Sequence, residues 1–467
     1  MKTTHTEAVV IGAGLSGLAS ARELRRSGIE VALLEARDRV GGRTLNHPIG
    51  DGKAVELGGQ WIGPGQDEIA ALADELGIPT FPTHDAGKKL FEHSGHVVAY
   101  NGTVPKAGPI GTAEFGIAVL RLERMAKRVP PRAPWEAPRA KAWDRETFAS
   151  WIRRNARSRF AREALTLWSE SVLAVDPADI SLLHVLAHAS AHRGVIALCS
   201  TTGGAQERRV VGGSQRIALA LAEELAECLR LRQPVRRIEH GDFVRVHTDH
   251  AVFEAKHVIV AMSPTMAGRL CYDPPLPPER DQLAQHMPMG SIVKCVAVYD
   301  EPFWRKSGRS GQALSDRGPV KFAFDNSPPD GNPGVLLGFV AGAHARSFSQ
   351  LAPEVRKQRA LDCFTRWFGP EADQPRDYVE KAWAQDEWAR GGYFGYMPPG
   401  VWTTLGPALG RPVGRLHWAG SETSGVCMGS MDGAIRAGKR AAAEVVDDIC
   451  AGPRPMCLNG ATSELLG

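Results

Sequence analysis

The chain lacks the features that mark several common protein classes. None of its eight cysteines belongs to a CxxC pair or has the companion histidine spacing of a zinc site, so the sequence predicts neither a disulfide framework nor a metal site. We expect separate buried thiols in a reducing compartment. The cysteines stand at positions 199, 228, 271, 295, 363, 427, 450 and 457.

Long apolar runs and an excess of charge of one sign are also missing. No segment approaches the length of a membrane span, and the opening residues MKTTHTE leave no room for a signal peptide before the first apolar segment. The net charge is +4, from 56 basic and 52 acidic residues that are interspersed, which gives no support to a nucleic-acid partner. We therefore expect a cytoplasmic protein without a membrane anchor.

A glycine motif near the N-terminus predicts a dinucleotide site. The apolar run Ala8–Ile11 is typical of a buried parallel strand, and it leads into Gly12, Gly14 and Gly17 with the spacing GxGxxG. These glycines allow a tight turn, a close approach of backbone amides to a pyrophosphate, and close packing of a helix over residues 15–27 on the strand. The phosphates would then lie at the N-terminus of that helix.

The residues after this helix make the prediction stronger. A second strand over residues 31–34 ends on Glu35, whose carboxylate is placed to accept both ribose hydroxyl protons. The alternative, a glycine-rich turn in an unrelated βαβ unit, does not require that carboxylate.

A second basic, glycine-rich turn follows Glu35 and reads RxRxGGRT. It resembles the FAD-binding signature of the flavin amine oxidase and desaturase superfamily, in which the arginines meet the pyrophosphate side of a buried FAD. The segment VELGGQWIG fits the same signature and implies further backbone contact with the cofactor. The residues concerned are Arg37, Arg39, Gly41, Gly42, Arg43, Thr44, Glu56, Gly58 and Gly59.

The length of the chain and the order of its segments predict two interleaved domains. With 467 residues, 43% of them hydrophobic, the chain can bury more than one core. We expect an α/β fold in which a Rossmann-like FAD-binding domain (1–82, 204–290 and 385–450) alternates with an α+β substrate-binding domain (83–203 and 291–384), before a flexible tail (451–467). Further strand-like segments are expected at 229–239, 244–248 and 255–261, and a long helical region is expected at 145–194.

The resemblance becomes sharper when the whole chain is considered. The sequence is similar to the flavin monoamine oxidases, including the mitochondrial enzymes, through GAGLSGL, LLEARDRVGGRT, ELGGQWIG, APWEAP, GGAQERRVVGGS, GSIVKCVAVYDEPFW, PPG and WAGSETSG. The resemblance implies FAD-dependent oxidation of a small-molecule amine to an imine, with O2 reduced to hydrogen peroxide. A homodimer is also plausible on this basis.

Lys294 is the first candidate catalytic residue. Alternation along the expected strand at 291–299 places its ammonium group in a row with Ile292 and Val296, where burial without a partner is costly. The alternative is a lysine that snorkels to solvent at a strand end. By resemblance, Lys294 holds a water against the reactive ring nitrogen of the flavin, as a base or an oxygen-activating group.

Tyr393 matches one tyrosine of the pair that sandwiches the amine in this family, a cage that acts through its π-faces. The partner position falls on Ser430, which is not aromatic, so half of the cage is missing and a wider pocket is implied. Core packing alone is the alternative for Tyr393. The position at which the mitochondrial enzymes attach FAD through a cysteine is Gly392, so the FAD is expected to be non-covalent.

Two more residues are assigned to the substrate pocket by resemblance. Gln206 matches a cavity-lining residue, with an ordinary turn residue as the alternative, and Trp388 matches a tryptophan packed beside the flavin ring, with core packing as the alternative. A helix over residues 429–446 is expected to direct its N-terminus at the flavin pyrimidine. The other residues expected at the cofactor are Leu15, Ser16, Ala36, Gln60, Trp61, Val235, Gly420, Ser421, Glu422, Ser430 and Met431.

Other readings of the sequence stay open. An L-amino-acid oxidase needs an arginine for the substrate carboxylate, which no motif assigns, and a carotenoid-type desaturase usually lacks the lysine and tyrosine described above. A polyamine oxidase is a further alternative. An FAD-binding module without turnover would not need Lys294 together with Tyr393.

Overall fold

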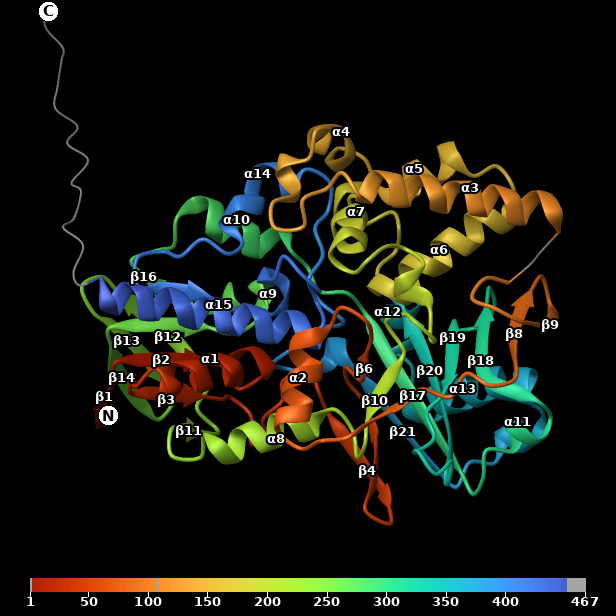
Figure 1. Ribbon diagram of the computed structural model, residues 1–467, viewed down its shortest axis with the longest axis horizontal. Coiled ribbons are helices and arrows are strands. Elements are labelled where there is room, and N and C mark those ends of the chain that lie inside the picture. The colour runs from red at the N-terminus through yellow and green to blue at the C-terminus, as the bar shows by residue number, and fades with distance from the viewer. Residues whose placement is uncertain (1, 106–107, 452–467) are drawn as a thin grey trace, which may run out of the picture.

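The computed structural model describes residues 2–105 and 108–451. It is a mixed α/β fold, as predicted: two five-stranded sheets lie on one side, a seven-stranded sheet on the other, and a group of helices above that larger sheet (Figure 1). The predicted tail falls almost entirely outside the described residues. In the described part of the chain, no helix combines the length and the apolar character needed to cross a membrane.

The central sheet of the nucleotide unit is entirely parallel and takes strands from distant parts of the chain. Its two most central strands are buried along their whole length, which explains why they read as short, continuous apolar runs rather than as alternating patterns. In sheet order the strands are β11 (Leu229–Arg230), β3 (Val31–Leu34), β2 (Ala8–Ile11), β15 (His257–Val260) and β22 (Leu416–Trp418).

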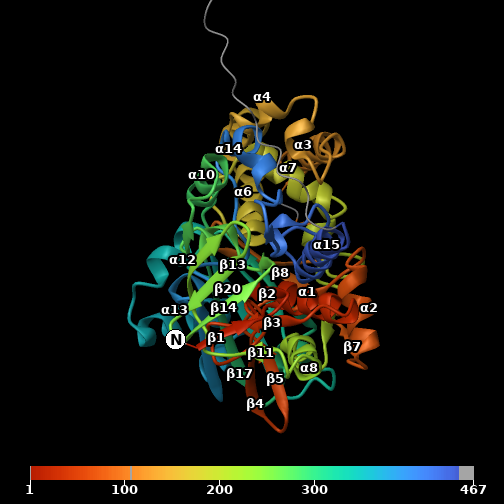
Figure 2. The same cartoon turned by 90° about the vertical axis from the view of Figure 1, so that its left-hand side faces the viewer.

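Two helices from opposite ends of the chain lie side by side against this sheet. Figures 1 and 2 both show α15 (Met431–Cys450) beside α1 (Leu15–Arg26). A Cβ added at Gly438 would lie 2.2 Å from the carbonyl oxygen of Ser16, and the hydroxyl of Ser20 donates to the Gly438 carbonyl at 3.1 Å. The close approach of the two backbones therefore requires a glycine at that position.

A second five-stranded sheet corrects two expectations. The segment 229–239 is not one strand, because Arg232 has a positive φ of 54° and the chain passes from β11 in one sheet to β12 in another. The segment 255–261 is likewise divided, because Ala255 ends β14 and β15 begins at His257. The strands of this sheet are β1 (Lys2–His5), β14 (Ala251–Ala255), β13 (Val244–Thr248), β12 (Val235–His240) and β16 (Cys271–Asp273).

The seven-stranded sheet has two fully buried central strands, β17 and β20. Alternate residues of β17 pack in different cores: Val293 and Cys295 contact the core that includes α13 (Pro353–Phe368), whereas Ile292 and Val296 face the nucleotide side. In sheet order the strands are β21 (Asp377–Ala382), β17 (Ile292–Tyr299), β20 (Gly334–Ala341), β19 (Phe322–Asp325), β18 (Arg309–Ser315), β8 (Lys88–His93) and β9 (His96–Tyr100).

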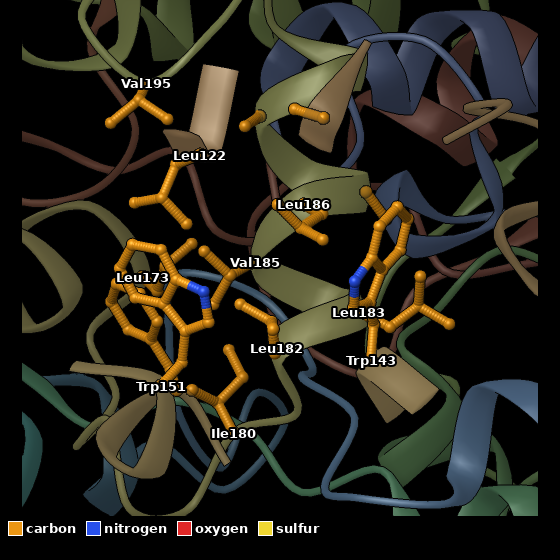
Figure 3. Packing of buried hydrophobic residues seen from close by; sticks show 14 of the residues in the cluster. Leu122, Trp143, Trp151, Leu173, Ile180, Leu182, Leu183, Val185, Leu186 and Val195 are labelled. Atoms are coloured by element: carbon orange, nitrogen blue, oxygen red, sulfur yellow. The ribbon is translucent and has the colours of Figure 1, made fainter. Parts of the chain in front are cut away.

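The predicted helical region at 145–194 consists of three helices. Each begins at a hydroxyl residue that caps it: Thr147, Ser158 and Ser181 accept a bond from a backbone amide two or three residues later. Figure 3 shows tryptophan and leucine side chains of this region meeting in one apolar core. The helices are α5 (Phe148–Asn155), α6 (Arg159–Leu173) and α7 (Leu182–Ala191), packed with α3 (Pro109–Ala126) and α4 (Ala140–Asp144).

Shorter elements connect these layers. The boundaries of the two interleaved domains remain a prediction, although the strands of each sheet come from segments that we expected to belong to one domain. The connecting elements are β4 (Asn46–Gly50), β5 (Lys53–Glu56), β6 (Trp61–Ile62), α2 (Asp67–Glu75), β7 (Thr80–Pro82), β10 (Arg208–Val210), α8 (Gln215–Glu224), α9 (Pro264–Ala267), α10 (Pro278–His286), α11 (Phe303–Lys306), α12 (Gly342–Phe348) and α14 (Val401–Leu405).

Candidate active site

A large cavity joins the two halves of the molecule. Its volume is about 950 Å³. At one end it is lined by the glycine turn before α1, and at the other end by side chains of the helical region such as Phe115 and Ile196. Lys294 and Tyr393 both line it, so the cavity brings the expected cofactor and substrate residues into one space.

Two glycines of the turn at the nucleotide end, Gly12 and Gly17, have no room for a side chain. Gly12 has a φ of 100°, and a Cβ on Gly17 would lie 1.8 Å from the carbonyl oxygen of Gly12. Gly14 is the N-cap of α1 and provides no side-chain cap, so the first amides of the helix are available to a bound anion. Gly17 itself packs the helix on the strand, as predicted for the third glycine of the motif.

Glu35 lies at the end of β3 and is held by the backbone. Its Oε2 accepts a bond from the amide of Ala13 at 2.8 Å, and its Oε1 accepts one from the amide of Arg37 at 3.0 Å. The side chain is 3% exposed and lines the cavity. These contacts fix a carboxylate beside the glycine turn, where an adenine dinucleotide presents a ribose.

The three arginines after Glu35 bind protein groups. Arg37 pairs with Asp386 at 2.5 Å and Arg43 with Glu422 at 2.7 Å, and both arginines line the cavity. Arg39 donates to backbone carbonyls of its own turn, at Val40, Gly42 and Thr44. Direct contact with a pyrophosphate was expected of all of them, and the structure places only Arg37 and Arg43 where they can reach a ligand.

Glu422 supports Arg43 from behind the cavity wall. It is 1% exposed, and it also accepts the amide of Gly395 at 3.2 Å. Burial alone would raise the pKa of Glu422, but the Arg43 guanidinium outweighs burial and holds that pKa below its usual value. The neighbours Gly420 and Ser421 form the wall itself.

The remaining expected cofactor residues surround the same space. The open helix amides, the fixed Glu35 carboxylate, the two arginines and the elongated volume together fit an FAD molecule. The expected residues that line the cavity, beyond those already described, are Leu15, Ser16, Ala36, Gly41, Gly42, Thr44, Gly58, Gly59, Gln60, Trp61, Val235, Trp388, Ser430 and Met431.

Lys294 lies at the middle of the cavity with its ammonium group fully enclosed. The residue is 2% exposed, so the snorkelling alternative is wrong. Its Nζ donates to the carbonyl oxygens of Glu56 at 2.9 Å and Gly58 at 2.8 Å, and to Oε1 of Gln60. Burial lowers the pKa of Lys294 to about 7, although the nearby Glu56 carboxylate opposes this shift.

A buried polar network surrounds these contacts. The carboxylate of Glu56 pairs with Arg209 at 2.7 Å, and Asn326 accepts a bond from Gln60 at 2.8 Å while donating to Glu56 at 3.3 Å. The second carboxylate oxygen of Glu56 is buried without a hydrogen-bond partner among the described residues. Neither Arg209 nor Asn326 was assigned a role from the sequence: Arg209 lies in the segment GGAQERRVVGGS, but nothing in that segment links it to Glu56, and Asn326 lies in no motif.

Tyr393 and Ser430 have different surroundings. The Tyr393 hydroxyl donates to the carbonyl of Ser171 at 3.3 Å, and burial raises the pKa of the phenol, which therefore stays neutral. Ser430 is the N-cap of α15: its Oγ accepts the amide of Gly433 at 3.1 Å and donates to the carbonyl of Cys427 at 2.6 Å. The residue in the second cage position thus serves the start of the helix.

Aromatic rings nevertheless lie close to Ser430. A Cβ on the preceding residue, Gly429, would lie 2.4 Å from the ring of Phe394, so that ring packs directly on Gly429. His188 stacks on the other side of Phe394, with 4.7 Å between ring centroids. Burial lowers the pKa of His188 well below its ordinary value, so this ring is neutral. His188 and Phe394 both line the cavity, and neither was identified from the sequence.

Trp388 and Trp383 occupy different parts of the cavity wall. The ring of Trp388 lies under the guanidinium of Arg236, 5.5 Å from its centroid, at the nucleotide side. Trp383 packs instead against Ile292 in the core beside Lys294, and its Nε1 donates to the carbonyl of Leu57 at 2.8 Å. Trp383, which the sequence analysis did not select, is therefore the tryptophan nearer the expected reacting centre.

Gln206 lines the cavity, and its side chain is held on one side only. Its Nε2 donates to the carbonyl of Leu198 at 2.9 Å, while its Oε1 is buried without a partner among the described residues. A buried amide oxygen without a partner is costly. The site therefore offers an acceptor at this point.

Comparison with known proteins places this geometry in a family. A family model described as flavin containing amine oxidoreductase matches residues 15–446. The chain is similar to a putative flavin-containing monoamine oxidase of Mycobacterium tuberculosis, with 45% identity over 440 residues that cover 94% of this chain and 96% of the relative. It is 35% identical over 446 residues to human amine oxidase [flavin-containing] B, covering 94% of this chain and 86% of that enzyme.

Solved structures agree with the sequence relatives. Putrescine oxidase bound to putrescine superposes with a TM-score of 0.92 at 32% identity, covering 96% of this chain and all of that chain. Cyclohexylamine oxidase from Brevibacterium oxydans IH-35A has a TM-score of 0.91 at 33% identity, covering 95% and 99%. The chain belongs to the flavin-containing amine oxidoreductase family: it is an oxidoreductase that uses FAD to oxidise amines.

Proposed function

We propose that the protein oxidises primary amines that carry an apolar, ring-sized substituent. The observation that carries this proposal is the group of aromatic side chains that line the cavity next to Lys294. Phe322 and Phe339 stack with 4.5 Å between centroids, Trp61 and Phe324 meet edge to face at 4.9 Å, and Phe339 lies 5.3 Å from the Lys294 ammonium. Such walls favour an apolar group and a neutral amine.

The contacts of Arg162 also favour such an amine over an amino acid as the substrate. The guanidinium of Arg162 lines the cavity, but it donates to the carbonyls of Ala156 and Arg157 at 2.9 Å and 2.7 Å. It is therefore already bound to the backbone and is poorly placed to bind a substrate carboxylate.

A diamine is the second candidate, because acidic side chains also line the cavity. His93 lies 2.9 Å from a carboxylate oxygen of Asp316 and 3.4 Å from one of Glu163. Burial raises the pKa of Glu170 to about 7. A second ammonium group on the substrate would find carboxylates here, and one of the structural neighbours is named a putrescine oxidase.

We assign the reacting end to Lys294 and Tyr393. The bound FAD supplies the oxidising chemistry, by accepting a hydride equivalent from the carbon next to the amine nitrogen. Lys294, with a pKa near 7, can lose a proton at neutral pH, and the lone pair of the neutral amine can then accept a hydrogen bond from a water molecule. The neutral face of Tyr393 orients the amine, and the apolar walls exclude bulk water. The imine product would hydrolyse after release.

The attachment of the cofactor follows from Gly392. A glycine provides no sulfur for a thioether, which supports a non-covalent FAD. Its position is also tight, since a Cβ there would lie 3.1 Å from Ile292 Cγ2. Denaturing the protein and removing the precipitate should therefore leave all of the flavin in solution. The cytoplasmic location and the homodimer remain predictions.

An anaerobic titration tests the substrate class. The yellow protein is mixed in separate experiments with benzylamine, cyclohexylamine, putrescine and L-leucine, and loss of the oxidised flavin absorption is followed before air is readmitted. We expect fast bleaching with the two ring amines, slow or no bleaching with L-leucine, and hydrogen peroxide after aeration. Fast bleaching by L-leucine alone would overturn the proposal.

The diamine candidate has its own variant test. If putrescine bleaches the flavin faster than the ring amines, Asp316→Asn should raise the KM for putrescine and leave the KM for benzylamine unchanged. An equal effect on both amines would mean that the acidic cluster does not select a second ammonium group.

A further inference from the structure

A group of histidine and acidic side chains lies at the end of the molecule away from the cavity. His257 is the first residue of β15, and His417 is the middle residue of the neighbouring parallel strand β22. Asp448 and Glu444 lie one turn apart near the end of α15, which passes beside the sheet. In Figure 1 this end of α15 lies at the left of the molecule, whereas α6, beside the cavity, lies at the right.

The ligand atoms of three of these residues converge on one point. His257 Nδ1 lies 3.3 Å from His417 Nε2, and His417 Nε2 lies 3.7 Å from Oδ2 of Asp448. One ligand atom of each residue lies within 4.8 Å of the other two. Both histidines are buried, with 4% and 0% exposure.

We propose that His257, His417 and Asp448 form a binding site for a divalent transition-metal ion, with zinc as the best match to two imidazoles and one carboxylate. Zinc ligands lie about 2.0–2.1 Å from the metal, so tetrahedral geometry separates neighbouring ligand atoms by about 3.3 Å. The distance between the two histidine nitrogens already has that value, and the 3.7 Å from His417 Nε2 to Asp448 Oδ2 exceeds it by a few tenths of an ångström. A water molecule completes the fourth position.

The surroundings of His417 match those of a metal ligand. Its other ring nitrogen, Nδ1, lies 3.1 Å from Oε2 of Glu444, and Glu444 is in turn held by Arg440 at 2.5 Å. A carboxylate that receives the second N–H of a ligating histidine fixes the ring tautomer and leaves Nε2 free for the metal.

Charged side chains lie beside this site. Lys256 precedes His257 and pairs with Glu7 at 3.2 Å, and Arg415 stands two residues before His417. Glu444 is already paired with Arg440, so the carboxylate of Asp448 is the group that would supply negative charge to the ion.

The position of the site indicates a structural role. The carboxyl ends of the parallel strands face the cavity, whereas His257 stands at the amino end of β15. None of the four residues is among the described residues that line the cavity. A metal here would join two strands of the central sheet to the last turns of α15, and it should raise stability without entering the reaction.

The same side chains can also interact with one another without a metal ion. Without an ion, Glu444, His417 and His257 make a chain of hydrogen bonds, while Asp448 Oδ2 lies 3.7 Å from His417 Nε2, which is beyond hydrogen-bond distance. Asp448 therefore separates the two possibilities: zinc binding requires it as a ligand, whereas the chain of hydrogen bonds does not include it.

Zinc titration of the FAD-loaded protein tests the proposal. The protein is dialysed against EDTA, transferred to chelator-free buffer and titrated with zinc chloride in a calorimeter, and its melting temperature is measured with and without zinc. We expect a tight site with one zinc per chain and a zinc-dependent rise in melting temperature. Cobalt(II) should give the visible absorption of tetrahedral coordination, at wavelengths beyond the flavin band.

Three variants on α15 supply the comparison, and none changes a buried histidine. Asp448→Asn should abolish tight binding, and Glu444→Gln should weaken it by about 10- to 100-fold, as expected when a ligating histidine loses its carboxylate partner. The matched control is Asp447→Asn, which removes the same charge from an exposed neighbour and should bind zinc as the wild type does. The proposal is overturned if the wild type binds no zinc, or if Asp448→Asn binds it as tightly as Asp447→Asn.

Discussion

Two cations that line the cavity, the half-buried Arg43 and the buried Lys294, differ in what surrounds their charge. Arg43 faces the carboxylate of Glu422 at 2.7 Å, so the pair carries fixed opposite charges. Lys294 is surrounded by uncharged oxygens: two carbonyls and the amide of Gln60. Arg43 therefore stays charged, whereas Lys294 readily loses a proton.

The difference arises from how the chain uses its buried acids. Glu56 lies beside Lys294, yet its carboxylate pairs with Arg209, and Lys294 receives only the Glu56 carbonyl. The pKa of Lys294 therefore falls to about 7, whereas the pKa of Glu422 stays below its usual value. Burial alone does not decide protonation; the formal charge of the contacting atom does.

Breaking the fixed pair should have the largest effect. Glu422→Gln leaves the half-buried Arg43 guanidinium without a counter-charge. Removing one partner of a fully buried pair typically costs about 3–5 kcal/mol, and because the Arg43 side chain is 27% exposed we expect a loss of about 2–3 kcal/mol. Urea unfolding of the FAD-loaded protein measures this loss. Glu301→Gln, which breaks an exposed pair with Lys306, is the control and should stay within about 1 kcal/mol. Equal stability of the two variants would contradict the comparison.

Removing the poised cation should affect turnover rather than folding. Lys294→Met is expected to lower kcat by about 10²-fold, the usual contribution of a positioned proton-transfer group, while the flavin content stays unchanged. Stopped-flow measurements of flavin reduction and reoxidation show which half-reaction is slowed. Lys357→Met, at an exposed position, should have wild-type kinetics, and the role assigned to Lys294 is lost if both variants behave alike.

The pH dependence should sharpen the comparison further. If the neutral amine of Lys294 is the active form, the rate falls as the pH falls through about 7. Gln60→Met removes an acceptor that stabilises the charged form, so it should lower the pKa of Lys294 and move this limb to lower pH by about one unit. The profile of kcat/KM against pH measures the shift, and Gln312→Met, at a buried glutamine bonded to Asp85 and Thr201, is the control. A shift to higher pH would reverse the proposed sign.

The smallest effect is expected at the start of α15. Ser430→Ala removes an N-cap, which costs about 1 kcal/mol, and thermal unfolding measures that loss. The KM for benzylamine should change little, because the serine hydroxyl already binds Gly433 and Cys427. A large change in KM without a loss of stability would instead place this hydroxyl against the substrate.

The nucleotide end could be predicted because its determinants are local. The spacing of Gly12, Gly14 and Gly17, followed by Glu35, encodes a turn, a helix and a carboxylate within a single βαβ unit. Arg43 was also visible in the sequence, but its partner Glu422 lies 379 positions away, and no local pattern links the two. The sequence thus predicts which residues stand at the cofactor, and not which of them bind each other.

Less of the substrate end could be predicted from the sequence, because its contacts also join residues that are far apart in the chain. Lys294 stood out because a charge in an alternating apolar row is costly, whereas its environment comes from segments as distant as Gln60 and Asn326. Trp383 and Trp388 lie five positions apart, and the sequence alone does not show which of them lies nearer Lys294. The path of the chain after β21 places Trp383 there. The cap role of Ser430 depends on where α15 begins: the helix was expected to start at residue 429, and it starts at Met431.

The contacts between the two ends of the chain bear on how the protein is made. Ser16 accepts a bond from the amide of Gly420 at 2.8 Å, Arg43 pairs with Glu422, and α1 packs on α15. A ribosome synthesises residues 420–450 long after the glycine turn near the N-terminus, so the walls of that turn are incomplete until Gly420 and α15 have been made. Cofactor loading is therefore a late step, and a chain released before Gly420 should be colourless.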